Sequence, residues 1–276
     1  MRGLDGARMR AMTLAIGVVT GFAVAVPSAH AITEEQHNVA DRFALGNAVW
    51  ILYHEIGHLL INEFQLPVLG REEDAVDHLA TVLLLEAADQ ENDQYLTDAI
   101  DGFFLSARVR ARVDTSRLVS SGHGLDEQRA FEVVCLMLGN DARSFGPLAD
   151  SVEMPEGERG RCAHAYGLAR SSWFTVLEAN TGGWFNRADP KSVAINYGPA
   201  GRANVSARTI LEGASVLERA ADFLGRTYTF PREVALRAEE CGEVNAFFEP
   251  DTGEVVICYE LVEDFRSLLA GYFEGL

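Results

Sequence analysis

The sequence has little positive charge. Its 276 residues include 23 Lys and Arg against 41 Asp and Glu, a formal net charge of −18 at pH 7. A surface this acidic repels nucleic acid and anionic membranes, so we expect neither as a partner. Internal repeats and low-complexity tracts are absent, and beyond the N-terminal segment no apolar run is long and clean enough to span a bilayer. These absences fit a soluble exported protein.

The N-terminal segment has the three parts of a secretory signal peptide. The basic stretch "MRGLDGARMR" precedes the apolar "AMTLAIGVVTGFAVAVP", and "SAHA" then places Ala29 and Ala31 at the −3 and −1 positions of a cleavage site. An uncleaved anchor is the alternative, but the Ala-x-Ala site argues against it. We predict a signal peptide over 1–31, cleaved after Ala31, a single domain over 32–276, and a secreted or periplasmic location.

The four cysteines all follow the predicted signal peptide. An even number of cysteines in an exported chain favours disulfides. We expect the pairs Cys135–Cys162 and Cys241–Cys258, because each closes a short local loop. A zinc site made of all four thiolates is the alternative, but the chain lacks the C-x-x-C spacing that such sites use.

Periodicity and chain breakers predict a mainly helical α+β fold. Helices are expected over 41–64, from about 71 onwards, and around 91–116, 126–139, 159–179, 207–225 and 261–274. The segment 180–206 is rich in Gly, Asn and Pro and is predicted to be a long loop. Short strands within 232–241, 244–250 and 254–260, with "PDTGE" as a hairpin turn, predict a small antiparallel sheet near the C-terminus.

The segment 41–64 carries chemistry that an apolar helix rarely carries. "HEIGH" places His54 and His58 four residues apart, so their imidazoles project from one face and can share a Zn²⁺ ion. Glu55 lies beside the pair and can take a proton from a water molecule on the metal. Gly57 lets another backbone or the substrate approach closely. A pair of satisfied core histidines is the alternative interpretation.

A catalytic zinc site needs a third protein ligand, and "GREEDAVDHLA" offers several. Glu73 is the preferred ligand, and Asp77, one turn later, can then accept the free N–H of a ligand histidine. Asp74 and His78 form another pair at this spacing and are the alternatives. Glu72 is interpreted as a solvated acid in the first turn of a helix, where acids match the helix dipole.

The pairing of "HEIGH" (54–58) with "EDAVD" (73–77) resembles the gluzincin metallopeptidases. More narrowly, the chain resembles an exported bacterial family described as a "putative metallopeptidase". The similar stretches are "GNAVWILYHEIGH", "LPVLGREEDAVDHLA", "HGLDEQRAFEVVCLMLG", "RCAHAYGLARSSW" and "CGEVNAFFEP…ICYEL". The resemblance implies a zincin-like active-site helix pair, one Zn²⁺ ion and hydrolysis of peptide bonds. Ala165 departs from the family pattern, which has an acid just before Tyr166.

Two further features bear on a substrate. "NAFFEPDTGEVVICYE" is similar to the edge strand of thermolysin-type enzymes, where an Asn-Ala-Phe segment lines the cleft, although there the strand precedes the metal helix. Asn245 and Ala246 are therefore candidates for binding a peptide main chain; a turn at Asn245 is the alternative. A donor for the developing oxyanion is also needed. His123 is the first candidate, and Tyr166, Tyr259 and Arg129 are the others.

The function that these patterns indicate is a zinc metallopeptidase acting on a peptide or protein substrate, with Glu55 as general base and then general acid. The principal alternative is an exported zinc-binding protein without peptidase activity. In that case His54 and His58 also hold zinc, but no open cleft is required. A metal hydrolase with another substrate is a narrower option, because activated water attacks many kinds of bond.

Overall fold

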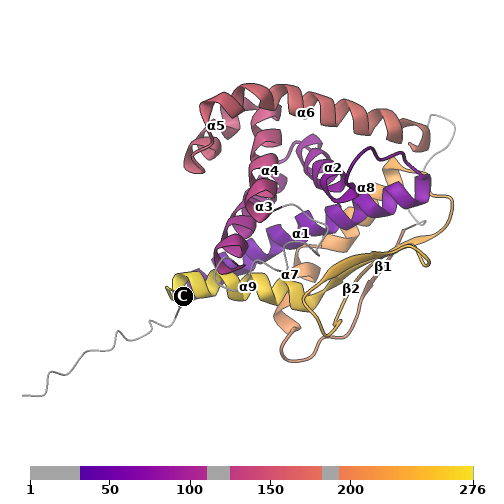
Figure 1. Ribbon diagram of the computed structural model, residues 1–276. Coiled ribbons are helices and arrows are strands. Elements are labelled where there is room, and N and C mark those ends of the chain that lie inside the picture. The colour runs from indigo at the N-terminus through magenta and orange to yellow at the C-terminus, as the bar shows by residue number, and fades with distance from the viewer. Residues whose placement is uncertain (1–31, 111–124, 182–192, 276) are drawn as a thin grey trace, which may run out of the picture. The chain divides into compact units, whose positions relative to one another are not determined.

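The computed structural model describes residues 32–110, 125–181 and 193–275, and these form a mainly helical α+β fold (Figure 1). The predicted fold class is therefore confirmed. The signal peptide prediction falls on 1–31 and His123 on 111–124, both outside the described residues. Within the described part, no helix has both the length and the apolar composition that a membrane span requires.

Helix α1 (Glu34–Phe64) is the central element and carries both histidines of "HEIGH". It starts earlier than predicted because Thr33 and Gln36 form a capping box, in which each side chain accepts the other's backbone N–H. It ends at Gln65, which adopts a left-handed conformation with φ 49° just before Pro67. Helices α2, α3 and α9 and strands β3 and β4 all pack against α1 (Figure 1).

The remaining helices enclose α1 or support its neighbours. Helix α4 contacts α2, α3, α5 and α6, and so connects the two helices α2 and α3, which pack against α1, to α5 and α6. Their bounds are α2 (Glu72–Glu86), α3 (Gln90–Arg110), α4 (Asp126–Asn140), α5 (Ala142–Ser151), α6 (Glu156–Leu177), α7 (Val205–Gly213), α8 (Val216–Thr227) and α9 (Tyr259–Phe273), with a short 3₁₀ turn η2 (Glu178–Asn180). The largest fully buried side chains include Trp50, Leu52, Ile56, Leu79, Leu84 and Met137.

Two helical details differ from the sequence prediction. Helix α5 was not predicted, because it contains Pro147; it forms because the side chain of Asp141 accepts the N–H groups of Arg143 and Ser144. The single helix predicted over 207–225 is two helices, α7 and α8. They are separated at Ser215, which has φ 51° and therefore interrupts the helical backbone.

The sheet is mixed, so the prediction of an antiparallel sheet is wrong. Its order is β1-β2-β4-β3, formed by β1 (Val193–Tyr197), β2 (Val234–Glu239), β3 (Ala246–Glu249) and β4 (Glu254–Cys258). Only the β3–β4 hairpin is antiparallel, whereas β1–β2 and β2–β4 are parallel. Strand β1 lies inside the segment predicted as a loop, and α7 and α8 form the crossover that a parallel pair needs.

The four cysteines form two disulfides, and both predicted pairs are confirmed. Cys135–Cys162 links α4 to α6, and Cys241–Cys258 links the segment before β3 to the end of β4. Disulfides persist in oxidising compartments such as the periplasm or the extracellular space. The covalent structure therefore fits the predicted kind of location.

Removing the α4–α6 disulfide is expected to lower the free energy of unfolding by about 3 kcal/mol, because a cross-link over 27 residues restricts the unfolded chain. The double variant Cys135→Ala/Cys162→Ala and the wild type should be compared by urea denaturation monitored by circular dichroism. The Cys241–Cys258 disulfide spans 17 residues, and the Cys241→Ala/Cys258→Ala variant, which lacks it, should lose a similar amount of unfolding free energy. An unchanged midpoint in either variant would contradict the expectation.

Candidate metal centre

The two histidines of α1 lie one helical turn apart and face the same point. Their Nε2 atoms are 3.3 Å apart, and their rings stand nearly perpendicular, at 75°. His54 is buried and His58 is partly buried, so the pair lies at the edge of the core rather than on open surface. The spacing in the sequence is therefore realised as a pair of converging imidazoles.

Helix α2 reaches this pair because Gly57 allows a close approach. A Cβ atom at Gly57 would lie 2.8 Å from the Cβ of Val76, a distance that real Cβ atoms almost never show. The close neighbour of Gly57 is thus a side chain of α2, not a substrate. Because Val76 is held there, the first turn of α2 and its acids face the histidines of α1.

Glu73 supplies the third donor atom. Its Oε2 is 3.3 Å from His54 Nε2 and 3.7 Å from His58 Nε2, so the three atoms form a compact triangle. Two ligand atoms bound tetrahedrally to zinc at about 2.0–2.1 Å lie about 3.3 Å from each other. The spacing and chemistry of the three donors therefore fit a zinc ion. A zinc site with three protein ligands has one further position for a water molecule.

Each imidazole is also held from behind by a carboxylate. His54 Nδ1 is 2.7 Å from Asp77 Oδ1, and His58 Nδ1 is 2.8 Å from Glu72 Oε1. A neutral imidazole protonated at Nδ1 would donate to its carboxylate and direct the Nε2 lone pair at the site, as metal binding requires. Asp77 thus lies where the sequence placed it, but Glu72, interpreted as a solvated acid, contacts a candidate ligand.

The alternative third ligands point elsewhere. Asp74 Oδ2 is 3.8 Å from the Nε of Arg71, and His78 Nε2 is 3.3 Å from Glu132 on α4. Among the described residues, the possible ligand atoms of His54, His58 and Glu73 all lie within 4.8 Å of one another, and Asp74 and His78 are not part of this group. Of the acids and histidine of "EEDAVDH", Glu73 is thus the one whose carboxylate approaches both imidazoles.

The site favours positive charge. Burial lowers the pKa of His54, but hydrogen bonds to Asp77 and Glu73 outweigh it and leave the pKa raised. For His58 burial acts in the same direction, yet the carboxylates of Glu73 and Glu72 raise its pKa to about 9. Burial raises the pKa of Asp77, and its hydrogen bonds with His54 and a nearby arginine lower it overall. A divalent cation would satisfy this same demand for positive charge.

Glu55 accompanies the metal-ligand candidates on α1. It is buried, with 9% of its surface exposed, and its charge raises the pKa of both His54 and His58. The charge of Glu55 therefore acts on the same two imidazoles that carry the nitrogen donor atoms. Its role as a general base stays a prediction.

The oxyanion-donor candidates that the structure describes are engaged in other contacts. The hydroxyl of Tyr166 donates to Glu86 and accepts from Asn140, and the hydroxyl of Tyr259 donates to the carbonyl oxygen of Gly198. Arg129 binds Asp77 through two hydrogen bonds. None of these three contacts points to oxyanion binding.

Strand β3 lies against α1, the helix that carries His54 and His58. Asn245 precedes it; the Asn245 side chain accepts the N–H of Ala246 and donates to Glu243. Strand β3 packs against α1, and among the described residues β4 is the only strand that pairs with it. In the described part of the chain β3 is therefore an edge strand of the sheet, and a substrate-binding role of Asn245 and Ala246 stays a prediction.

These features define a mainly helical α+β protein with a candidate metal centre between two helices. The chain belongs to the family described as "Putative metallopeptidase", whose sequence profile matches residues 8–177 and 198–274. Neither a search of curated proteins nor a search of solved structures finds a match. The resemblance inferred from the motifs is thus confirmed, and with it the assignment to a family of suspected hydrolases.

Proposed function

We propose that the protein is an exported zinc metallopeptidase that hydrolyses peptide bonds. The observation that carries the proposal is the triangle of His54 Nε2, His58 Nε2 and Glu73 Oε2, at 3.3, 3.3 and 3.7 Å, with Glu55 beside it. The family supports a metal-dependent hydrolase. The predicted signal peptide over 1–31 and the two disulfides support a secreted or periplasmic location.

In the proposed mechanism His54, His58 and Glu73 would hold one Zn²⁺ ion. The ion would polarise the substrate carbonyl and lower the pKa of a water molecule in the site. Glu55 accepts a proton from this water as it attacks the carbonyl carbon. Glu55 then donates the proton to the nitrogen of the leaving amine, so that the carboxylate is regenerated.

The edge of β3 that does not pair with β4 is the proposed binding surface for the peptide. A substrate in extended conformation would add a strand beside β3 and be fixed by main-chain hydrogen bonds. Because β3 packs against α1, such a strand would pass close to the helix of His54 and His58. Asn245 and Ala246 at the start of β3 are the residues proposed to meet the substrate main chain.

Metal analysis combined with a peptidase assay tests the proposal. The purified protein, loaded with Zn²⁺ and dialysed, is expected to contain one zinc per chain by mass spectrometry. It should cleave denatured protein or quenched fluorescent peptides, lose this activity with a zinc chelator and regain it when zinc is restored. One tightly held zinc without any peptide cleavage would instead support the alternative, an exported zinc-binding protein.

A further inference from the structure

Arg129 of α4 lies behind the metal centre and is bound to Asp77 through a two-pronged ion pair. Its Nε is 2.7 Å from Asp77 Oδ2 and its terminal nitrogen is 2.9 Å from Asp77 Oδ1. Asp77 is buried and Arg129 is partly buried, with 6% and 13% of their side-chain surfaces exposed. Asp77 Oδ1 also accepts the proton of His54 Nδ1 at 2.7 Å. A continuous chain of contacts thus runs from α4 through α2 to α1.

The guanidinium of Arg129 is itself held by two aromatic rings. Its central carbon lies 5.3 Å from the ring centre of Trp50 on α1 and 4.6 Å from that of Phe103 on α3. The two rings pack edge to face, and the indole N–H of Trp50 donates to Thr81 of α2. Because a planar guanidinium stacks on such rings and binds carboxylates with both prongs, its position is narrowly defined.

A buried carboxylate held by one imidazole alone could rotate, and its charge would be poorly compensated. The two hydrogen bonds from Arg129 fix the plane of the Asp77 carboxylate and balance its charge. The orientation of Asp77 in turn sets the orientation of the His54 ring, because a carboxylate that accepts the free N–H of a ligand imidazole fixes both its tautomer and its direction.

We propose that Arg129 is a positioning residue of the metal centre, which acts through Asp77 to aim His54 Nε2 at the ion. The sequence suggested Arg129 as an oxyanion donor. Because its guanidinium binds Asp77, we propose the positioning role in place of that one. The inference rests on the metal site of the proposed function. It concerns metal affinity and does not depend on which substrate is cleaved.

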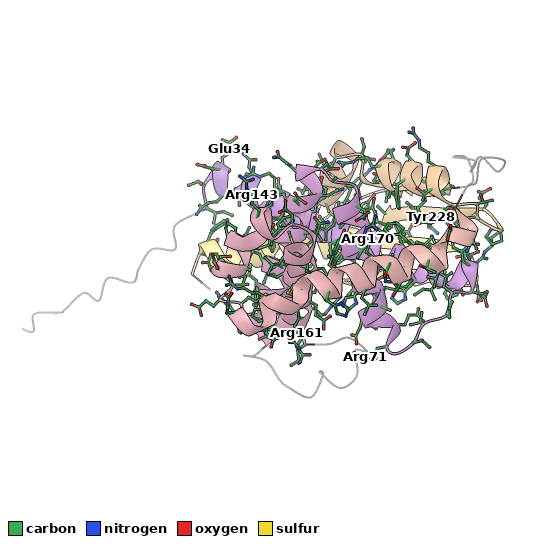
Figure 2. All side chains as sticks on the ribbon, turned by 90° about the horizontal axis from the view of Figure 1, so that it is seen from above. Glu34, Arg71, Arg143, Arg161, Arg170 and Tyr228 are labelled. Carbon is green, nitrogen blue, oxygen red and sulfur yellow. A yellow bond between two sulfur atoms is a disulfide. The ribbon has the colours of Figure 1, made fainter. Side chains whose placement is uncertain are left out.

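Arg170 provides a matched control. It makes the same two-pronged pair with Glu86, at 2.7 and 2.8 Å, and its guanidinium lies 5.0 Å from the ring centre of Phe174. Arg170, which is labelled in Figure 2, lies on α6. Neither Arg170 nor Glu86 belongs to the chain of contacts from Arg129 through Asp77 to His54. Arg170→Gln therefore removes the same kind of interaction without touching the metal centre.

The test compares Zn²⁺ affinity in the wild type, Arg129→Gln and Arg170→Gln, measured by competition with a chromophoric chelator. Each protein is first shown to be folded by circular dichroism. Arg129→Gln is expected to weaken zinc binding about tenfold, the lower end of the effect of losing an outer-shell partner. Arg170→Gln should bind zinc as the wild type does. Equal affinity in the two variants overturns the inference.

The route through Asp77 is tested by combining substitutions. Asp77→Asn alone is expected to weaken zinc binding about 10–100-fold. Adding Arg129→Gln should then cost little more, because the carboxylate that Arg129 positions is already gone. Arg129→Lys, which keeps the charge but not the two-pronged geometry, should regain part of the affinity. Losses that simply add in the double variant would overturn the inference.

The outcome for the wild type separates this inference from the proposed function. If the wild type binds one zinc but Arg129→Gln behaves as Arg170→Gln does, the metal centre stands and the role of Arg129 is wrong. If the folded wild type binds no zinc, the proposed function fails and the inference fails with it. Cobalt substitution adds a spectroscopic check, because a misdirected His54 would alter the visible absorption of bound Co²⁺.

Discussion

Glu55→Gln is expected to lower kcat/KM for peptide hydrolysis by about 10²–10⁴-fold while zinc remains bound. Glutamine has nearly the shape of glutamate, so the buried position of Glu55 stays filled and the helix stays intact. An amide cannot accept the proton of the attacking water, so the step assigned to Glu55 is lost. The measurement is steady-state cleavage of a peptide substrate together with zinc content by mass spectrometry.

Glu132→Gln is the appropriate control for this experiment. Glu132 lies on α4 and pairs with His78, and neither residue is part of the donor triangle. The Glu132→Gln variant should keep both bound zinc and peptidase activity, because the substitution removes a glutamate away from the proposed chemistry. If Glu55→Gln retained full activity, proton transfer by Glu55 would be ruled out even though zinc was bound.

The elements with strong local signals were predicted well from the sequence. The breakers Pro67 and Gly70 separate α1 from α2, and "PDTGE" forms the turn between β3 and β4, as expected. The disulfides were predictable because each pair closes a short loop between neighbouring elements. These features depend on residues close together in the chain, which is where sequence patterns are most informative.

The features that the sequence did not predict depend on contacts between residues far apart in the chain. Strand β1 is a five-residue segment among Gly, Asn and Pro, and it forms because β2, about forty residues later, pairs with it in parallel. Nothing local in "VAINY" signals that partner. Without a prediction of β1, α7 and α8 cannot be recognised as a crossover between two parallel strands. The sheet is then wrongly expected to be antiparallel.

The candidate site shows the same division. The helical spacing of His54 and His58 was enough to place both imidazoles on one face. The sequence already preferred Glu73, but Asp74 and His78 remained alternatives, because distinguishing them depends on the rotation of α2, which is set by the packing of Val76 on Gly57. The contacts of Glu72 and Arg129 were missed, because they depend on how α2 and α4 sit against α1, and no spacing along the chain encodes this.

That rotation of α2 is also the basis of the second large effect we expect. Glu73→Ala should weaken zinc binding more than about 100-fold, the upper limit for loss of an outer-shell partner, because Glu73 is proposed to contact the ion directly. Its Oε2 lies within 3.7 Å of both imidazole Nε2 atoms, and among the described residues Glu73 is the carboxylate grouped with these two imidazoles as a possible metal ligand. Zinc affinity by chelator competition measures the effect.

Asp74→Ala, at the next position of α2, is the decisive comparison. Asp74 is half exposed and its carboxylate faces Arg71, so its removal should leave zinc affinity unchanged. Both variants remove one acid from the same helical turn, and they change the net charge and the helix dipole interaction equally. A difference between them therefore isolates direct binding from the general field of the acidic cluster. If Asp74→Ala lost zinc and Glu73→Ala kept it, α2 would have to be rotated relative to α1, and the donor triangle would be wrong.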